Sequence, residues 1–457
     1  MAARIAAKLF LLLFITLAAR TLGRAGFGSF SYHLAFAQLF AFLLDLGVAT
    51  ASVREGSRDE AKSQRIFGSA LFVKLALVLP VVALVPFLSM VYAGEGSWYL
   101  GFFAISVVAL DSFAAFLWGP FRIRNNLRHI AFAEVGRAVL TLVFFALATW
   151  GGWAGAGVAL ACYFLGALAA FRYPVAQVWA HQYIILSGVQ WPAIRALLRP
   201  ALIISAASAL YVAGNRLDIL LLEKLKGQEE VGLYNSAYTL FMNIDGIVLL
   251  ACMVVFPRLS AVTATGISAT RSFILRMASP FLALSLPIAL VGPILAAPVT
   301  RIIFGAEFIF AGPMLAILLL AAGLLFPGKL LWYLMIACDR QARLLGIAVV
   351  AVALNLGLNF LLIPSMGGRG SAIATLVMEI ILLIGFLVTL QAYIPWRDIL
   401  RETARPATAA VIVAFICLTA LAFIPYVLVP LVGLLYLPLL RLFSGRRLVH
   451  AFGFADK

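Results

Sequence analysis

Long apolar runs separated by short charged segments constrain this fold more than any other feature of the sequence. A helix needs about 20 apolar residues to cross the hydrocarbon core of a bilayer, because each residue adds about 1.5 Å. Such runs lie near residues 5–22, 28–52, 66–92, 98–118, 129–149, 154–172, 200–222, 232–256, 272–297, 310–336, 342–363, 370–393, 405–423 and 426–442. They predict an all-α polytopic membrane protein with about 14 transmembrane helices, or about 12 if the last pair, interrupted by Pro425 and Pro430, lies in the interface.

The composition supports a membrane protein and argues against a soluble one. Hydrophobic residues make up 64% of the chain and charged residues 11%, whereas soluble domains are about 45–50% apolar and about 25% charged. The formal net charge of +16 needs no nucleic-acid partner, since Lys and Arg collect in the cytoplasmic loops of membrane proteins. The four cysteines are far apart and form no CxxC pair, so we expect no metal site and no disulfide framework.

Along the chain, connections between spans that hold several basic residues alternate with connections that hold few. With the N-terminus inside, the inner connections and tails hold 24 Lys and Arg residues and the outer ones hold 6. This bias predicts cytoplasmic termini and a multi-pass protein of the cell (inner) membrane. The first run follows basic residues as a signal peptide does, but we expect it to remain as a span because further spans follow it.

The longest connection, Arg172–Arg199, separates two groups of six spans. Its later part, WPAIRALLR, places apolar residues on one helical face and arginines near the opposite face, as in a helix lying on a membrane surface. We expect an N-terminal six-helix bundle over residues 1–173, a cytoplasmic linker with an amphipathic elbow helix over 174–199, a second six-helix bundle over 200–395, and a helix pair with a basic cytoplasmic tail over 396–457.

A glycine motif occurs once in each group of six spans. Gly23–Phe30 reads GRAGFGSF and Gly227–Tyr234 reads GQEEVGLY, so both fit G-x-x-x-[FV]-G-x-[FY]. A second pair, Gly152–Ala159 (GWAGAGVA) and Gly367–Ala374 (GGRGSAIA), lies at the fifth turn of each group. A phosphate-binding loop would need a soluble strand before it, so we expect these glycines to permit tight turns and close helix packing. Two halves of equal topology predict a pseudo-two-fold axis along the membrane normal, as in parallel-repeat transporters.

Charged residues inside the spans are the candidates for a functional site, because each costs about 2.5–3.5 kcal/mol at the centre of an isolated span and must face an interior or a cavity. The basic candidates for a substrate-binding cavity are Arg20, Arg24, Lys74, Arg137, Arg216 and Lys329. The acidic candidates for ion pairing or for carrying a coupling ion are Asp111, Glu134, Asp218, Asp245 and Glu379.

Two interpretations of these charges stay open at this point. In the first, they are structural pairs, such as Lys74 with Asp111 and Glu134 with Arg137. In the second, they form a cationic cavity for an anionic substrate, since Arg and Lys bind phosphate through charge-assisted hydrogen bonds. No HExxH, GxSxG or Walker motif occurs, and the loops are too short for a soluble catalytic domain, so we expect no enzymatic activity and no cofactor.

Four stretches, in this order, carry a resemblance to a known family. They are ARTLGRAGFGSFSYHLAFAQLFAFLLDLGVATASVRE (Ala19–Glu55), DILLLEKLKGQEEVGLYNSAYTL (Asp218–Leu240) with FPRLS (Phe256–Ser260), IFGAEF (Ile303–Phe308) and NLGLNFLLIPSMGGRGSAIAT (Asn355–Thr375). The chain resembles the Wzx-type polysaccharide-unit flippases, in the superfamily that also holds the lipid II flippases and the multidrug exporters. The resemblance extends over nearly the whole chain.

The resemblance implies a V-shaped pair of six-helix bundles that work by alternating access. They would move a polyprenyl-diphosphate-linked oligosaccharide from the inner to the outer leaflet, for O-antigen, lipopolysaccharide or exopolysaccharide synthesis. It also implies a polysaccharide polymerase and a chain-length regulator as partners. Arg20 and Arg24, with Arg54, are loosely similar to cavity arginines of lipid II flippases. The alternatives are a lipid II flippase, a cation-coupled multidrug exporter and, third, a membrane enzyme of glycan assembly.

Overall fold

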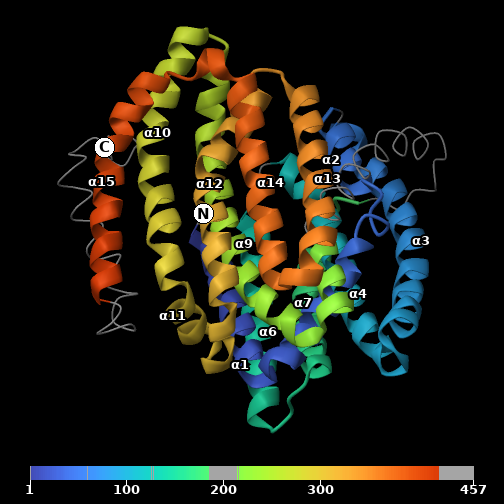
Figure 1. The fold of residues 1–457 in the computed structure, drawn as a ribbon. Helices are drawn as coiled ribbons and strands as arrows, with labels where there is room; N and C mark the ends of the chain where they lie inside the picture. Colours follow the sequence, from blue (N-terminus) through green and yellow to red (C-terminus); the bar gives the residue numbers. More distant parts are fainter. Residues whose placement is uncertain are drawn as a thin grey trace. The chain divides into compact units, whose positions relative to one another are not determined.

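The computed structural model describes residues 2–58, 60–124, 126, 128–184, 214 and 216–420, and this part of the chain is helical, with no strand (Figure 1). It divides into two compact units, Met1–Gly232 and Leu233–Lys457. The helices of the first unit are α1 (Ala2–Leu39), α2 (Val48–Arg58), α3 (Glu60–Ala93), α4 (Trp98–Leu117), α5 (Gly119–Ile123), α6 (Arg128–Trp150) and α7 (Ala156–Ala180), with the 3-10 helix η1 (Glu95–Ser97) before α4.

Helix α9 (Gln228–Thr263) begins in the first unit and continues into the second. The other helices of the second unit are α10 (Ile267–Leu290), α11 (Gly292–Phe304), α12 (Gly312–Ala337), α13 (Gln341–Met366), α14 (Gly368–Thr389) and α15 (Trp396–Ala420), with the 3-10 helices η2 (Ala306–Ala311) and η3 (Gln391–Tyr393).

Ten helices of the described residues are long and apolar enough to cross a membrane, which confirms a polytopic helical protein. The predicted total of about 14 spans stays a prediction. The elbow helix near 191–199, most of the span near 200–222 and the span near 426–442 lie outside the described residues, as does the basic tail. The predicted division into bundles at residues 174–199 also stays a prediction, although α7 itself continues to Ala180.

The predicted span over 28–52 is not one continuous helix, because α1 ends at Leu39 and turns occupy the residues before α2. Leu46 and Gly47 have φ values of 42° and 74°, in the left-handed region, which a continuous right-handed helix does not contain. The Asp45 carboxylate then accepts the Ala49 N–H at 3.3 Å, so an acidic side chain satisfies a free amide in the first turn of α2. The run over 272–297 is likewise divided into α10 and α11, at Val291.

The glycines that begin the two copies of the first motif make turns, as predicted. Gly23 has φ 66° and ψ −175° and divides α1 into two helical segments, and Gly227 has φ 84° immediately before α9. A side chain at such a φ is strained, which favours glycine. The second motif has positive φ at the same first position, in Gly152 and Gly367.

The second glycines of the two copies, Gly28 and Gly232, pack against each other's helix backbone. A Cβ on Gly28 would overlap the carbonyl oxygen of Gln228 and lie 2.7 Å from its carbonyl carbon. A Cβ on Gly232 would overlap the carbonyl oxygen of Arg24 and lie 3.0 Å from that carbonyl carbon. In each case the partner carbonyl is four residues before the partner glycine, so the contact has the two-fold pattern of the repeat itself. Close packing by these glycines is therefore confirmed.

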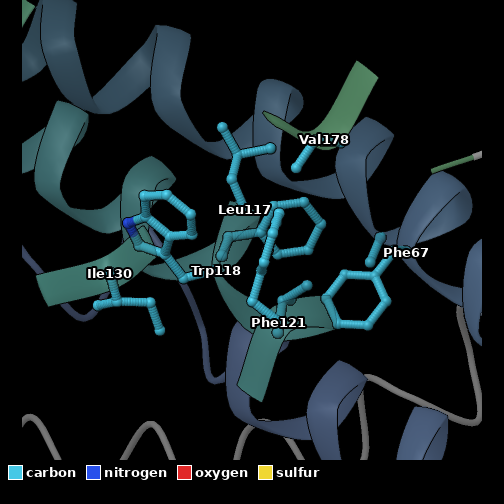
Figure 2. Close-up of a cluster of buried hydrophobic side chains, with 9 residues drawn as sticks. Phe67, Leu117, Trp118, Phe121, Ile130 and Val178 are labelled. Atoms are coloured by element: carbon cyan, nitrogen blue, oxygen red, sulfur yellow. The ribbon is translucent and has the colours of Figure 1, made fainter. Parts of the chain in front are cut away.

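An aromatic cluster joins the ends of α4, α5, α6 and α7 in the first unit. Figure 2 shows its side chains, with Trp118 and Phe121 beside Ile130 of α6 and Phe67 of α3. The rings of Trp118 and Phe121 lie edge to face at 5.1 Å, a favourable aromatic geometry. This cluster fixes the ends of the helices that carry the charged residues described below.

The second unit packs around α12, the most buried of its long apolar helices. Helices α10, α11 and α14 contact α12, and α13 packs along α14 (Figure 1). Helix α15 lies beside α10, where Ala409, Ala410, Val413 and Cys417 are fully buried.

Candidate functional site

An ion pair with a buried lysine links α3 to the turn before α2 in the first unit. The ammonium group of Lys74 donates to the Asp45 carboxylate and, at 2.7 Å, to the Ser112 hydroxyl of α4. The Lys74 side chain is 0% exposed, so no solvent reaches it. Two oxygen partners satisfy this buried ammonium, as a buried charge requires.

A second ion pair, between α4 and α6, is more exposed than the first. The Arg137 guanidinium donates to the Asp111 carboxylate and lies over the Tyr163 ring of α7, 5.0 Å from its centroid. The side chains of Arg137 and Asp111 are 26% and 41% exposed. Arg216 is within electrostatic range of Tyr163. This pair differs from the first because its charges border open space.

The open space is a cavity of ≈ 180 Å³, which we call the α4–α6–α7 crevice. Its charged lining residues are Asp111, Arg122, Glu134 and Arg137, and half of the others are alanines of α4, α6 and α7. Trp118, Ile130 and Pro174, also in its lining, lie toward the helix ends joined by the aromatic cluster. The crevice therefore connects that end of the unit with the Arg137–Asp111 pair.

The second unit has its own group of membrane-embedded charges, on α9, α12 and α14. Lys329 Nζ lies 2.9 Å from Asp245 Oδ1, and their side chains are 26% and 12% exposed. Glu379 is half-buried and within electrostatic range of both residues. One ammonium group thus faces two carboxylates in this group, so the three side chains share a net negative charge when all are ionised.

Three further candidates lie on α1 and in the helical segment before α9. Arg20 is exposed on the first segment of α1, and Arg24 is half-buried directly after the Gly23 break. Asp218 is buried and accepts the Ile219 N–H at 2.8 Å.

The pairing of Lys74 with Asp111, one of the two examples of structural charge pairs drawn from the sequence, is wrong. Lys74 pairs with Asp45 and Asp111 pairs with Arg137, because the turn before α2 brings a nearer carboxylate to α3. Asp45 is absent from the candidates above, although an acidic residue inside the run 28–52 is the same kind of signal as Asp111. Nothing in the sequence marks Ser112 or Tyr163 as partners of these charges. No cluster of metal-ligating residues occurs in the part of the chain that the structure describes.

Comparison with known proteins gives a family match and a fold match. Residues 1–263 match the polysaccharide biosynthesis protein family. A comparison with curated protein sequences finds no match.

Two solved structures illustrate the fold match. The lipid II flippase MurJ in an inward closed conformation is similar with a TM-score of 0.79 and 15% identity, over 97% of this chain and 98% of that chain. An inward-facing multidrug resistance MATE family transporter of the MOP superfamily is similar with a TM-score of 0.65 and 15% identity, over 87% of this chain and 95% of that chain. At such identities, these similarities concern the fold.

Proposed function

The chain belongs to the polysaccharide biosynthesis protein family, and from this premise we propose that it is a flippase for a polyprenyl-diphosphate-linked oligosaccharide. It moves this lipid from the cytoplasmic to the outer leaflet by alternating access, for the synthesis of a cell-surface polysaccharide such as O-antigen. The protein lies in the inner membrane with both termini in the cytoplasm. A polysaccharide polymerase and a chain-length regulator act on the product after it has crossed.

One observation carries the proposal: the Arg137–Asp111 pair borders the α4–α6–α7 crevice instead of being sealed. A guanidinium binds a phosphate through two parallel charge-assisted hydrogen bonds, as it binds a carboxylate. The diphosphate replaces Asp111 as the partner of Arg137 during transport, and Asp111 takes the guanidinium back after release. The charge of Arg137 is therefore never left without a partner inside the membrane.

The two basic residues of the first unit have different roles in this proposal. Arg137 contacts the substrate, because 26% of its side chain is exposed beside the crevice. Lys74 holds the start of α2 to α3 and α4, because its ammonium group is sealed between Asp45 and Ser112. Arg20, Arg24 and Arg216 are secondary candidates for diphosphate contacts.

Transport is coupled to a proton at the charges of the second unit. Lys329 faces the two carboxylates of Asp245 and Glu379, and a net charge inside the membrane is costly. Binding of one proton removes that net charge. A cation-coupled multidrug exporter would use similar chemistry, and a lipid II flippase carries the same diphosphate, so both remain alternatives for the substrate.

The experiment measures the leaflet distribution of lipid-linked sugar in cells that lack this protein. A leaflet-specific sugar label should show the lipid-linked oligosaccharide retained on the cytoplasmic side, with recovery after the wild-type chain is returned. Arg137→Ala should fail to restore export at normal protein level, and Arg137→Lys should restore it in part. Arg343→Ala, which changes an exposed arginine of α13, is the matched control and should restore export fully.

Normal exposure of the oligosaccharide at the outer surface without the protein would refute the flippase function. Full export by Arg137→Ala would leave the function in place and remove Arg137 from the substrate site. Export of a cationic drug, with lipid-linked sugar unaffected, would favour the exporter instead.

A further inference from the structure

One face of α7 carries a row of exposed side chains that the proposed function does not use. Leu165, Leu168, Arg172, Ala176 and Trp179 follow each other at spacings of three or four residues, so they form one stripe along the helix. Leu165 is 46% exposed, Leu168 42% and Trp179 69%. A row of exposed apolar side chains on a membrane helix suits contact with lipid tails.

The stripe borders a groove of ≈ 540 Å³. Phe144 of α6 forms part of its wall, and Leu165, Leu168, Ala169, Val175 and Ala176 of α7 supply much of the rest. From Leu165 to Ala176 the groove extends about 16 Å along the helix, at about 1.5 Å per residue. This is about the depth of one leaflet, since the hydrocarbon core is about 30 Å thick. Its length and apolar lining suit one hydrocarbon chain of a lipid.

Among the residues that the structure describes, Arg172 is the one charged residue that lines this groove. Its side chain makes no hydrogen bond or ion pair with another described residue. Trp179 is seven residues further along the same stripe, about 10 Å nearer the helix end. Because exposed Trp side chains mark the membrane interface, Arg172 lies on the hydrocarbon side of it. A cation at this depth needs an anionic partner, and its stem can pack along the groove.

The charge around Arg172 favours an anion from the lipid rather than from the protein. Residues 156–184 contain no Asp or Glu. Helix α6 has one acidic residue, Glu134. It lines the α4–α6–α7 crevice together with Ala167, Ala170 and Pro174, and these three residues lie on a different face of α7 from Arg172. Among the residues that the structure describes, the groove lining thus holds the cation of Arg172 and no acidic side chain.

We propose that the groove binds an anionic phospholipid of the cytoplasmic leaflet, with one acyl chain along the α7 stripe and its phosphate on Arg172. The guanidinium donates two hydrogen bonds to the phosphodiester oxygens. A phosphodiester carries one negative charge and matches the single cation of the groove. A polyprenyl diphosphate fits less well, because it carries more charge and its chain is longer than one leaflet is deep. The site is independent of the proposed transport function.

Native mass spectrometry of the purified full-length protein, released from detergent with added lipid, tests the proposal. The probes are phosphatidylglycerol, which is anionic, and phosphatidylcholine with the same acyl chains, which has no net charge. We expect the wild-type protein to retain phosphatidylglycerol at least about tenfold better than phosphatidylcholine, because the choline cation of phosphatidylcholine competes with Arg172 for the same phosphate. Arg172→Gln should lose this preference and Arg172→Lys should keep part of it.

Two further variants separate the groove from general surface charge. Leu168→Trp fills the groove and should reduce retention of both lipids, whereas Arg276→Gln, at an exposed arginine of α10, should leave the preference unchanged. Thermal unfolding of each variant, followed by tryptophan fluorescence, confirms that it is folded.

Equal retention of the two lipids by the wild-type protein would overturn the proposal, and so would an unchanged preference in Arg172→Gln. Stronger retention of geranylgeranyl diphosphate than of phosphatidylglycerol would assign the groove to the polyprenyl lipid. A dimer mass that disappears with Leu168→Trp would assign the groove to a second copy of the chain.

Discussion

Alanine at Gly28 or Gly232 would force apart the two helix segments that carry the copies of the glycine motif. A Cβ on Gly28 would lie 2.7 Å from the carbonyl carbon of Gln228, and ordinary contact begins at 3.4 Å. The segments must therefore separate by at least about 0.7 Å at this point, and further to clear the carbonyl oxygen. The obstacle is backbone on both sides, which cannot move away as a flexible side chain can.

The expected cost follows from overpacking. Inserting a methyl group into a closely packed contact typically costs about 1–3 kcal/mol. We expect Gly28→Ala and Gly232→Ala each to lower the unfolding free energy by about this amount. The double variant should cost less than the sum of the two, because one separation of the segments accommodates both methyl groups.

The assay is reversible unfolding of the purified protein in mixed detergent and SDS micelles, followed by tryptophan fluorescence. Gly136→Ala in α6 is the matched control, since its Cβ would meet nothing within 4 Å. Removal of a helical glycine there should stabilise the protein by about 0.5–1 kcal/mol. Equal stabilities of Gly28→Ala and Gly136→Ala, or additive costs in the double variant, would show that the two segments are not in this close contact.

Three other predictions concern the charges and a thiol. Lys74→Met leaves the Asp45 carboxylate, which is 24% exposed, without its cation, so it should cost about 1–3 kcal/mol in the same unfolding assay, and adding Asp45→Asn should recover much of that loss. The Glu379→Gln variant cannot bind a coupling proton at this position, so its transport of the oligosaccharide in membrane vesicles should lose its dependence on an imposed pH gradient. If the dependence is retained, the coupling proton binds at a residue other than Glu379. Burial raises the pKa of the Cys338 thiol, and its hydrogen bond with Tyr393 opposes this shift with a smaller effect. The reactive thiolate is therefore scarcer at pH 7 than in an exposed cysteine. The rate of maleimide labelling, measured from pH 7 to pH 10, should rise at a higher pH for Cys338 than for a surface cysteine.

The sequence determined the properties that depend on short stretches of chain. The apolar runs near 66–92, 98–118 and 129–149 appear as α3, α4 and α6, because a membrane span is defined by about 20 residues in succession. The turns at Gly23 and Gly227, where φ is positive, could also be predicted from the sequence, because the glycine motif recurs at equivalent places in the two halves. The family could be named from the order of such motifs.

Only the tertiary structure decided which distant residues meet. The sequence allowed Lys74 to pair with Asp111, but the left-handed turn at Leu46 and Gly47 brings Asp45 to α3 and leaves Asp111 to Arg137. The motif in each half indicated close packing, but not that Gly28 would pack against the helix of Gly232. Helical periodicity assigns a side chain to a face of its own helix. The partner on that face depends on how the helices cross, which many weak contacts along both helices determine together.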